Sequence, residues 1–204
     1  MRAIRLIPWA GLLLLCSCAP LGGTRSEAPT LHTLEHTHAG LVFSPQGPRL
    51  RVSMTRAAPG LDSARMFYQR RPHERAAYSR SRWLEPPARL IGPLLVQALE
   101  SSGHFSAILS GSEAAEADLR LDSELLQLHQ DFTRTPSVLV LQMRVQLFAL
   151  DSRALLGSRV IEAEEPAGED AYAGVLAANR AASRVLDEVM RFSAEIAGQR
   201  SGRP

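Results

Sequence analysis

The sequence has only two cysteines and no lysine. Cys16 and Cys18 both lie at the end of the first apolar segment, so no pair remains for a disulfide in the rest of the chain. Stability must then come from packing, which is feasible because a folded part of about 150 residues buries roughly 70% of its unfolded surface. All 23 basic residues are arginine, and we draw no function from that choice.

Aromatic residues and catalytic motifs are also scarce. Phe, Trp and Tyr make up 5% of the chain, too few for a stacking platform that binds single-stranded nucleic acid. The sequence contains no nucleophile elbow, phosphate-binding loop, dinucleotide fingerprint or His-Glu-x-x-His pattern. His104, His129 and Asp131 are the residues that a hydrolytic site could use, but their expected places at a turn and a strand end favour ordinary surface polar residues. We therefore expect neither catalysis nor a cofactor.

A long hydrophobic run is missing as well. The apolar segment at residues 6–15 is too short to span a bilayer permanently. It follows Arg2 and Arg5, and small residues come after it, which is the order typical of an export signal. The chain is therefore predicted to leave the cytoplasm.

Cys18 is the predicted site of lipid attachment. The sequence Leu15-Cys16-Ser17-Cys18 resembles a lipobox, with leucine three positions before Cys18 and a small serine directly before it. Cys16 fits less well, because the bulky Leu15 precedes it. We expect residues 1–17 to be a lipoprotein signal peptide; the alternative is an ordinary secretory signal that is cut elsewhere.

Residues 18–48 are expected to form a lipidated flexible tether. They are rich in Gly, Pro, Ser, Thr and His and show no sustained period. About 30 residues of coil have a root-mean-square span of roughly 30 Å and a stretched reach near 100 Å. His32, His36 and His38 lie close to Glu35 and could bind a metal, but a coil does not fix the geometry of its ligands. A solvated linker is favoured, and no metal site is predicted.

From residue 49 the pattern becomes that of a folded domain, expected over residues 49–198 with a disordered tail at 199–204. Leu50, Val52 and Met54 alternate with polar residues, as in a half-buried strand. A bulge is expected further on, where Leu126 and Leu128 change face. Residues 65–71 and 76–82 are expected to form a hairpin closed around Pro72-His73-Glu74. Further strands are predicted at 105–109, 119–128 and 154–163, and at 138–150, where alternate residues from Leu139 to Ala149 form an unbroken apolar face.

The stretch at residues 78–100 joins a strand to a helix. Pro86 and Pro87 interrupt the strand, and apolar residues then recur at helical spacing. Pro87 is expected to open this helix and Gly103 to stop it. Pro93 lies further inside and predicts either a later start, near Arg89, or a bend on the solvent side.

A last helix, expected over residues 170–197, is rich in alanine. Small side chains such as Ala178, Ala181 and Ala182 allow a helix to lie close to a sheet, and Asn179 is expected to be a satisfied polar residue rather than a ligand. Runs of strands with two inserted helices predict an α+β fold with two layers, in which both helices cover one face of a mostly antiparallel sheet.

In their order and spacing, these features resemble the ABC-type transport auxiliary lipoproteins, the PqiC-like family that serves Mce-type lipid transporters. The resemblance begins with Tyr78, Trp83 and the prolines that open the helix. It continues with Ala-Asp-Leu-Arg-Leu at 117–121, the strand at 138–149 followed by Asp151, and the alanine-rich last helix. It covers about residues 50–196.

The resemblance implies a non-enzymatic lipoprotein that works by docking and supports envelope integrity. Its partner would be the periplasmic Mce-domain subunit of an ABC lipid transporter, and it would reach the membrane through its lipid anchor. Ala19 follows Cys18 where inner-membrane lipoproteins usually carry aspartate, so the periplasmic face of the outer membrane is expected. A structural envelope-assembly lipoprotein and a lipid-carrying periplasmic shuttle are the alternatives. The sequence leaves homo-oligomer formation open.

Charge is distributed unevenly along the chain. Residues 49–89 contain ten arginines and three acids, whereas residues 90–204 contain ten arginines and sixteen acids. Such asymmetry can orient a protein against an anionic surface or a complementary neighbour. Arginine on exposed strand faces can equally serve only to keep sheet edges soluble.

Tyr78, Arg80 and Arg82 are the candidate docking residues. In strand alternation Trp83 points away from Tyr78, so Trp83 is assigned to packing beneath the first helix. Tyr78 would then share an outer face with the two arginines, a composition favoured at the centres of interfaces. The alternative is that Tyr78 only covers a sheet edge.

Overall fold

The computed structural model describes residues 27–36, 42–44, 46–110 and 116–201. The predicted signal peptide and Cys18 lie outside the described residues, as do His38 and the last three residues of the expected tail.

The sheet is organised around β7 (Leu119–Asp131). One edge of β7 pairs antiparallel with β8 (Val138–Ala149), which pairs antiparallel with β9 (Leu155–Pro166). Three short strands pair in parallel along its other edge, one after another: β2 (Arg49–Val52), β3 (Arg56–Ala57) and β4 (Arg65–Arg71). The sheet is therefore mixed, and its long pairings are antiparallel.

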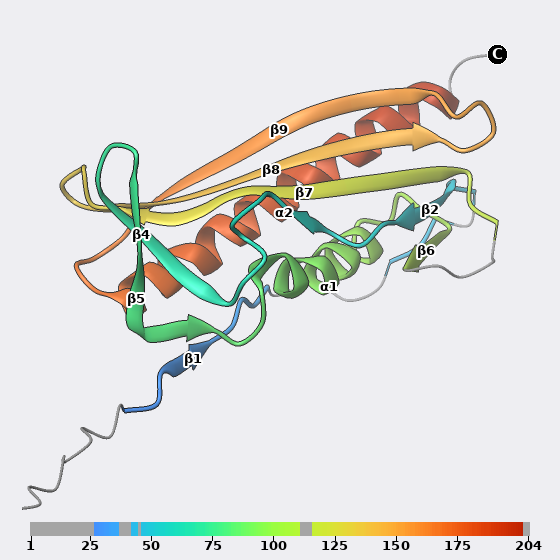
Figure 1. The fold of residues 1–204 in the computed structure, drawn as a ribbon. Helices are drawn as coiled ribbons and strands as arrows, with labels where there is room; N and C mark the ends of the chain where they lie inside the picture. Colours follow the sequence, from blue (N-terminus) through green and yellow to red (C-terminus); the bar gives the residue numbers. More distant parts are fainter. Residues whose placement is uncertain (1–26, 37–41, 45, 111–115, 202–204) are drawn as a thin grey trace, which may run out of the picture.

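Three further strands extend the sheet beyond β2 and β4. The predicted hairpin is confirmed, because β4 pairs antiparallel with β5 (Glu74–Trp83). The edge of β5 carries β1 (Thr30–His32), and β2 carries β6 (Ala107–Ser110), both in parallel. In Figure 1 the hairpin and β1 lie at the same end of the molecule.

Two helices cover one side of the sheet (Figure 1). The helix α2 (Ala171–Ser201) lies along β8 and β9, while α1 (Pro87–Glu100) packs beside β3, β6 and β7, and the two helices contact each other. The predicted α+β class with both helices in one layer is confirmed. The expected tail is wrong at its start, since α2 runs on to Ser201.

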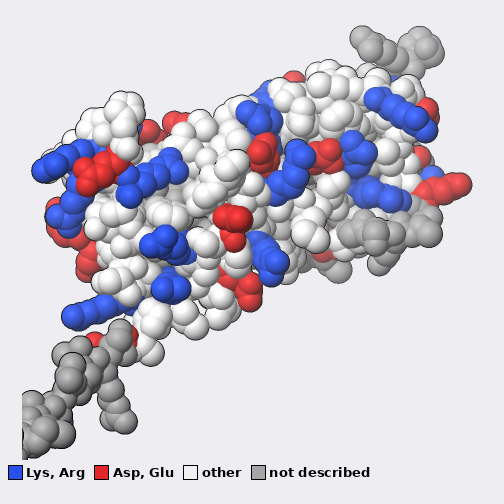
Figure 2. Space-filling view, in the orientation of Figure 1, with Lys and Arg blue, Asp and Glu red and all other residues white. Residues whose placement is uncertain are grey.

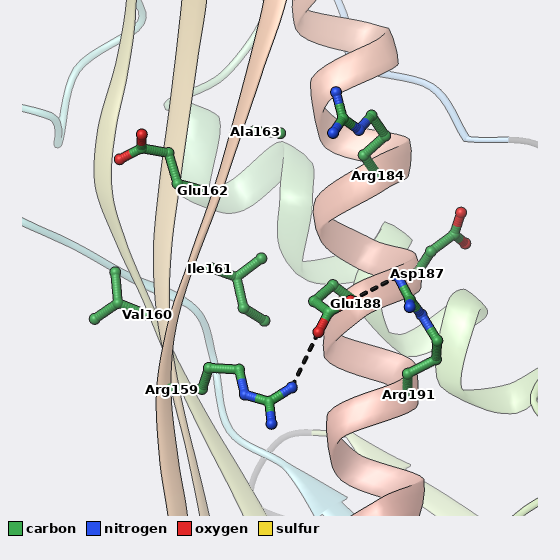
Figure 3. Close-up of a pocket in the computed structure, with 9 residues that line it drawn as sticks. All are labelled: Arg159, Val160, Ile161, Glu162, Ala163, Arg184, Asp187, Glu188 and Arg191. Carbon is green, nitrogen blue, oxygen red and sulfur yellow. Dashed lines mark hydrogen bonds and ion pairs between the residues drawn. The ribbon is translucent and has the colours of Figure 1, made fainter.

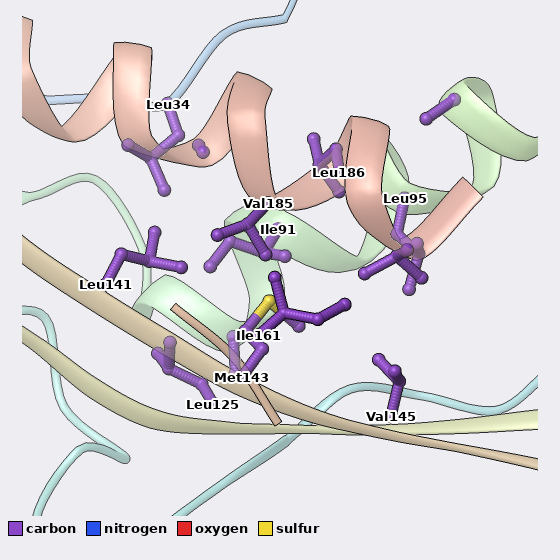
Figure 4. Packing of buried hydrophobic residues seen from close by; sticks show 14 of the residues in the cluster. Leu34, Ile91, Leu95, Leu125, Leu141, Met143, Val145, Ile161, Val185 and Leu186 are labelled. Atoms are coloured by element: carbon purple, nitrogen blue, oxygen red, sulfur yellow. The ribbon is translucent and has the colours of Figure 1, made fainter. Parts of the chain in front are cut away.

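The core lies between the helices and the buried face of the sheet. On β8, Leu141, Met143 and Val145 are each 0% exposed, whereas the intervening Arg144 faces solvent. Figure 4 shows this row of apolar side chains close to Ile91 of α1 and Leu186 of α2. Full burial of such a side chain contributes about 1.5 to 3 kcal/mol, so the alternation predicted for this strand fixes which face becomes the core.

Other predicted features of the sheet are partly confirmed. The bulge is present, as a register shift between Leu125 and Gln127. The strand that starts at Arg49 ends at Val52, however, so the expected inward position of Met54 is wrong, and Met54 is 82% exposed. Strand β9 also runs to Pro166, because Pro166 pairs with Val138 at the sheet edge and needs no donor on its outer side.

The first helix begins where the sequence predicts. Pro86 is the residue before the helix and Pro87 its first residue, so a later start near Arg89 is wrong. Pro93 lies inside α1 at an exposed position. Because proline has no N–H, one helical hydrogen bond is missing there, on the side of the helix that faces solvent rather than the core. A proline ring is tolerated best on that side of a helix.

Gly103 ends the segment that follows α1. Its φ is 69°, a left-handed conformation that glycine adopts without a Cβ penalty. Its N–H donates to the carbonyl of Val42 at 3.1 Å, and the N–H of Val42 donates to the carbonyl of Glu100 at 3.0 Å. An added Cβ on Gly103 would lie 2.9 Å from Cγ1 of Val42. Val42, near the end of the expected tether, is thus held to the domain by backbone hydrogen bonds with Glu100 and Gly103.

Residues 30–36, which we call the strap, correct the expectation of a tether without structure. Leu34 is 4% exposed, the N–H of Glu35 donates to Oδ1 of Asn179 at 2.6 Å, and Nδ1 of His36 lies 3.0 Å from Oγ of Ser183. A strand of three residues is too short to produce a period in the sequence. Its pairing partner is also some fifty positions away in the chain.

Candidate functional site

Trp83 is placed as expected. It is 3% exposed and belongs to the hydrophobic core, directly before the turn that leads into α1. Its backbone N–H donates to the carbonyl of Ala64 at 2.9 Å. The side chain therefore packs inside the domain and is not available to a partner.

Tyr78 is not on the outer face predicted for it. Its hydroxyl donates to Oε1 of Gln130 at 2.8 Å, and its ring lies 4.8 Å from that of Tyr68. Burial is the main reason why the pKa of Tyr78 rises to about 12, and the nearby Tyr68 adds to the effect. The alternation fails because the strands of the hairpin are out of step: between the pairs Arg65–Arg82 and Phe67–Ala77, five residue steps on β5 oppose two on β4.

The aromatic and guanidinium groups meet instead near the turn of the hairpin. The guanidinium of Arg70 lies 5.5 Å from the ring centre of Tyr68 and 5.6 Å from that of Phe132. The rings of Tyr68 and Phe132 meet edge to face at 6.0 Å. We call Tyr68, Arg70, Tyr78 and Phe132 the turn-end cluster. No sequence signal predicts it, because only the pairing of β4 with the end of β7 brings Phe132 to the hairpin.

The arginines of the hairpin form no ion pairs with the described residues. All six are exposed, and Glu74 is the only acid of the two strands. In Figure 2, basic side chains gather at this end of the molecule with some acidic ones among them. We call these six the hairpin arginines: Arg65, Arg70, Arg71, Arg75, Arg80 and Arg82.

Arginines elsewhere behave differently. Most of those on the rest of the described chain have an acidic partner within 4 Å, which leaves the hairpin as the main surface where guanidinium charge is uncompensated. The paired arginines are Arg49, Arg89, Arg120, Arg134, Arg144, Arg159, Arg180, Arg184, Arg191 and Arg200.

Gln130 joins the hairpin to the loop before α2 through a buried polar network. It is 1% exposed, and its Nε2 donates to Oγ of Ser137 at 2.9 Å and to the carbonyl of Gly168 at 2.7 Å. With Tyr78 as donor to its oxygen, each polar atom of the amide has a partner. The network is a structural support for the turn-end cluster, since buried amides are stable only when satisfied.

The three residues considered for hydrolysis do not converge. His104 lies in the loop before β6, beside the start of β2, whereas His129 and Asp131 lie at the far end of β7. Leu119, which pairs with β2, precedes His129 by ten residues, or about 33 Å along a strand. Burial, and then the charge of Arg75, lower the pKa of His129. Burial opposes ionisation of Asp131, but hydrogen bonds from Thr133 hold its pKa below the usual value.

The histidines of the strap are also separated. His32 faces Tyr172 with ring centres 6.3 Å apart, while His36 is beside Ser183, eleven residues further along α2. Eleven residues of helix span about 16 Å, too far for two ligands of one ion. Within the described part of the chain, no group of three or more His, Cys, Asp or Glu side chains could hold a metal.

Two surface hollows contain no catalytic arrangement. Figure 3 shows the cleft between β9 and α2, where Arg159 donates to Glu188 at 3.0 Å and Arg191 lies 2.6 Å from the same carboxylate, so the charges compensate each other. The second is an open groove of about 630 Å³ between α1 and the chain after β2, with Met54 and Val96 in its mostly apolar lining.

The fold and surface define an α+β domain with an uncompensated basic hairpin. No helix of the described chain is long and apolar enough to cross a membrane. The chain belongs to the family of ABC-type transport auxiliary lipoprotein components, whose model matches residues 30–190. It is therefore an auxiliary lipoprotein of an ABC transport system, and the resemblance found in the sequence is confirmed. The match begins at β1, which agrees with the strap being part of the domain.

Solved structures share this fold. A Xanthomonas campestris protein of the DUF330 family has 20% identity and a TM-score of 0.71, with 87% of this chain and 99% of that one covered. The hypothetical protein CT253 of Chlamydia trachomatis has 10% identity and a TM-score of 0.52, with coverage of 74% and 98%. No curated protein matches the sequence.

Proposed function

We propose that this chain is a non-enzymatic auxiliary subunit of an Mce-type ABC lipid transporter. It is anchored by lipid at Cys18 to the periplasmic face of the outer membrane, and it docks the periplasmic Mce-domain component of the transporter to that membrane. The family match supports an auxiliary role in ABC transport. Ser17 before Cys18 and Ala19 after it support the anchor and its destination.

One observation carries the docking role: the hairpin arginines lack ion-pair partners in the described chain, although most other arginines have one. Of these, Arg70, Arg71 and Arg75 are near the turn, where Arg70 also contacts two aromatic rings. Exposed guanidinium groups beside aromatic side chains are common at the centres of interfaces. We assign this turn end to an acidic surface of the Mce-domain component.

The test is affinity purification of the full lipidated chain from detergent-solubilised envelope, with a tag at its C-terminus. The Mce-domain component should be recovered, and Arg70→Gln with Arg71→Gln and Arg75→Gln should lower its recovery about tenfold or more. The matched control, Arg56→Gln with Arg153→Gln and Arg191→Gln, removes the same charge from exposed positions elsewhere and should recover as much as the parent.

Two results would replace this proposal with an alternative. Recovery of outer-membrane assembly factors without a transporter subunit would indicate a structural assembly lipoprotein. Lipid retained after purification, and lost when Met54 and Val96 of the open groove are made polar, would indicate a lipid-carrying shuttle. Cys18→Ser tests the anchor in the same preparation, because mass spectrometry should find the variant without acyl chains.

A further inference from the structure

The described chain enters the domain beside the hairpin. β1 pairs with the last residues of β5, Thr30 with Ser81 and His32 with Trp83. Twelve residue steps separate Thr30 from Cys18, which span at most about 40 Å when fully extended. If Cys18 carries lipid, as the proposed function requires, this end of the domain stays close to the bilayer.

An amphipathic face lies at the entry point. Across β4, β5 and β1, the partners Arg65, Arg82 and Leu31 form one row, because residues in register on neighbouring strands share a face. Leu84 lies two positions after Arg82, and so on the same face. Arg80 precedes Arg82 by two positions, within the irregular part of β5, and its side chain is exposed. The backbone N–H of Leu84 continues the pairing by donating to the carbonyl of His32 at 2.7 Å.

These five residues, which we call the anchor-side face, are all exposed. Leu31 is 56% and Leu84 55% exposed, although both are large apolar side chains. The three arginines have no ion pair with the described residues, and the nearby Glu85 is engaged by Arg89 at 3.7 Å. Exposed leucines between uncompensated arginines are the composition of surfaces that lie in a membrane interface.

We propose that the anchor-side face binds the anionic lipid surface of the membrane that holds the anchor. The guanidinium groups of Arg65, Arg80 and Arg82 meet lipid phosphates, while Leu31 and Leu84 enter the boundary of the acyl chains. Each arginine near an anionic membrane strengthens binding roughly fivefold. Such a basic face adds electrostatic attraction to anionic lipids beyond the binding that the lipid anchor supplies. The hairpin would then hold the membrane at one end and the transporter component at the other.

The test uses the chain from residue 19 to 204 without lipid, because every core residue lies between Leu34 and Ala197 and is retained. Sedimentation with vesicles of phosphatidylcholine and phosphatidylglycerol should show binding that vesicles of phosphatidylcholine alone do not. Arg65→Gln with Arg80→Gln and Arg82→Gln should weaken it about a hundredfold, following the fivefold contribution of each arginine.

Three controls show whether the effect belongs to this face. Leu31→Ser with Leu84→Ser should weaken binding without changing the charge, whereas Arg56→Gln with Arg153→Gln and Arg191→Gln should leave it within threefold of the parent. Thermal melting of each variant confirms that the exposed substitutions leave the fold intact. Equal weakening by the two arginine triples would indicate net charge alone and overturn the proposal, as would absence of binding to the anionic vesicles.

Failure of this inference is distinguishable from failure of the proposed function. Capture of the Mce-domain component by a chain that ignores anionic vesicles leaves the transporter role standing and removes the membrane contact. Vesicle binding without capture of the Mce-domain component would leave the membrane contact standing and remove the transporter role. Loss of the captured component in the variant Arg65→Gln with Arg80→Gln and Arg82→Gln, with vesicle binding unchanged, would assign this face to a protein partner and overturn the inference.

Discussion

Gly174 determines how closely α2 can approach the buried amide of Gln130. A Cβ added at Gly174 would lie 2.4 Å from Oε1 of Gln130, whose side chain is held by several hydrogen bonds. Gly174→Ala should therefore destabilise the domain by about 1 to 3 kcal/mol, the usual cost of overpacking. The measurement is urea unfolding followed by circular dichroism.

Gly198→Ala is the matched control in the same helix. Nothing lies within 4 Å of a Cβ added there, and the position is exposed. Replacing glycine by alanine inside a helix normally stabilises by up to about 1 kcal/mol, so the two substitutions should have opposite signs. If both stabilise, the network around Gln130 is able to move, and its proposed role as a rigid support is wrong.

Glu165 links the acid stability of the domain to α2. It is 9% exposed and accepts hydrogen bonds from Arg184 at 2.8 Å and Arg180 at 3.2 Å. The bond from Arg184 is the main reason why its pKa is lowered, although burial opposes the shift. A carboxyl with a lowered folded pKa contributes stability above its unfolded pKa of about 4.3, and this is lost as the pH falls through the folded value.

Glu165→Gln should therefore be less stable than the parent near neutral pH, and the difference should shrink as the pH falls below about 4. Denaturant unfolding at several pH values measures the two curves. Glu169→Gln, at an exposed position, should follow the parent throughout. A difference for Glu165→Gln that grows in acid would show that the charge of Glu165 does not stabilise the fold.

The face on which a side chain lies was predictable only where the paired strands keep a regular register. Trp83 was expected in the core and lies there, because the apolar periodicity of the next helix fixes the side that it faces. The side predicted for Tyr78 is wrong, since the register shift within β5 interrupts the alternation between Tyr78 and Trp83. A hairpin can hold extra residues on one strand, and such a bulge cannot be recognised from the spacing of apolar residues in the sequence.

At the scale of elements, α1 contains an avoidable weakness. Pro93 has no N–H, so the carbonyl of Arg89 lacks its usual donor within the helix. Pro93→Ala should restore this hydrogen bond and raise the free energy of unfolding by about 1 to 3 kcal/mol. Alanine also gives the unfolded chain more conformational freedom than proline, which lowers this gain by up to about 1 kcal/mol. Thermal melting checks this, with exposed Gln97→Ala as a control that should change little. A lower melting temperature for Pro93→Ala would show that its ring is needed in the adjacent groove.

Long elements were predictable, and the two shortest strands were not. β8 alternates between buried and more exposed residues from Leu141 to Ala149, and the hairpin of β4 and β5 is local in the sequence. β1 has three residues and β3 has two, and each pairs with a strand far away in the chain. Such strands are specified by tertiary contacts, which explains why the sequence pattern predicts coil for the strap.

At the scale of the whole molecule, the strap sets how far the domain can stand from the membrane. A free tether from Cys18 to β2 would have 31 residue steps and a reach near 100 Å, whereas the strap leaves twelve steps before Thr30, or about 40 Å. Leu34 and Asn179 hold the strap to α2. The membrane contact and the short distance between the domain and the membrane both depend on the attachment of the strap to α2, since β1 supplies part of the anchor-side face.

Releasing the strap should therefore lengthen the tether and loosen the membrane contact together. Leu34→Ala with Asn179→Ala removes a buried side chain and the amide that accepts from Glu35, so amides of residues 30–36 should exchange hydrogen much faster while those of β8 stay protected. Neutron reflectometry of the lipidated chain on an anionic bilayer should place the domain farther from the surface. Leu155→Ala, at an exposed leucine on β9, should change neither measurement. A released strap with an unchanged domain height would mean that another surface sets the distance to the membrane.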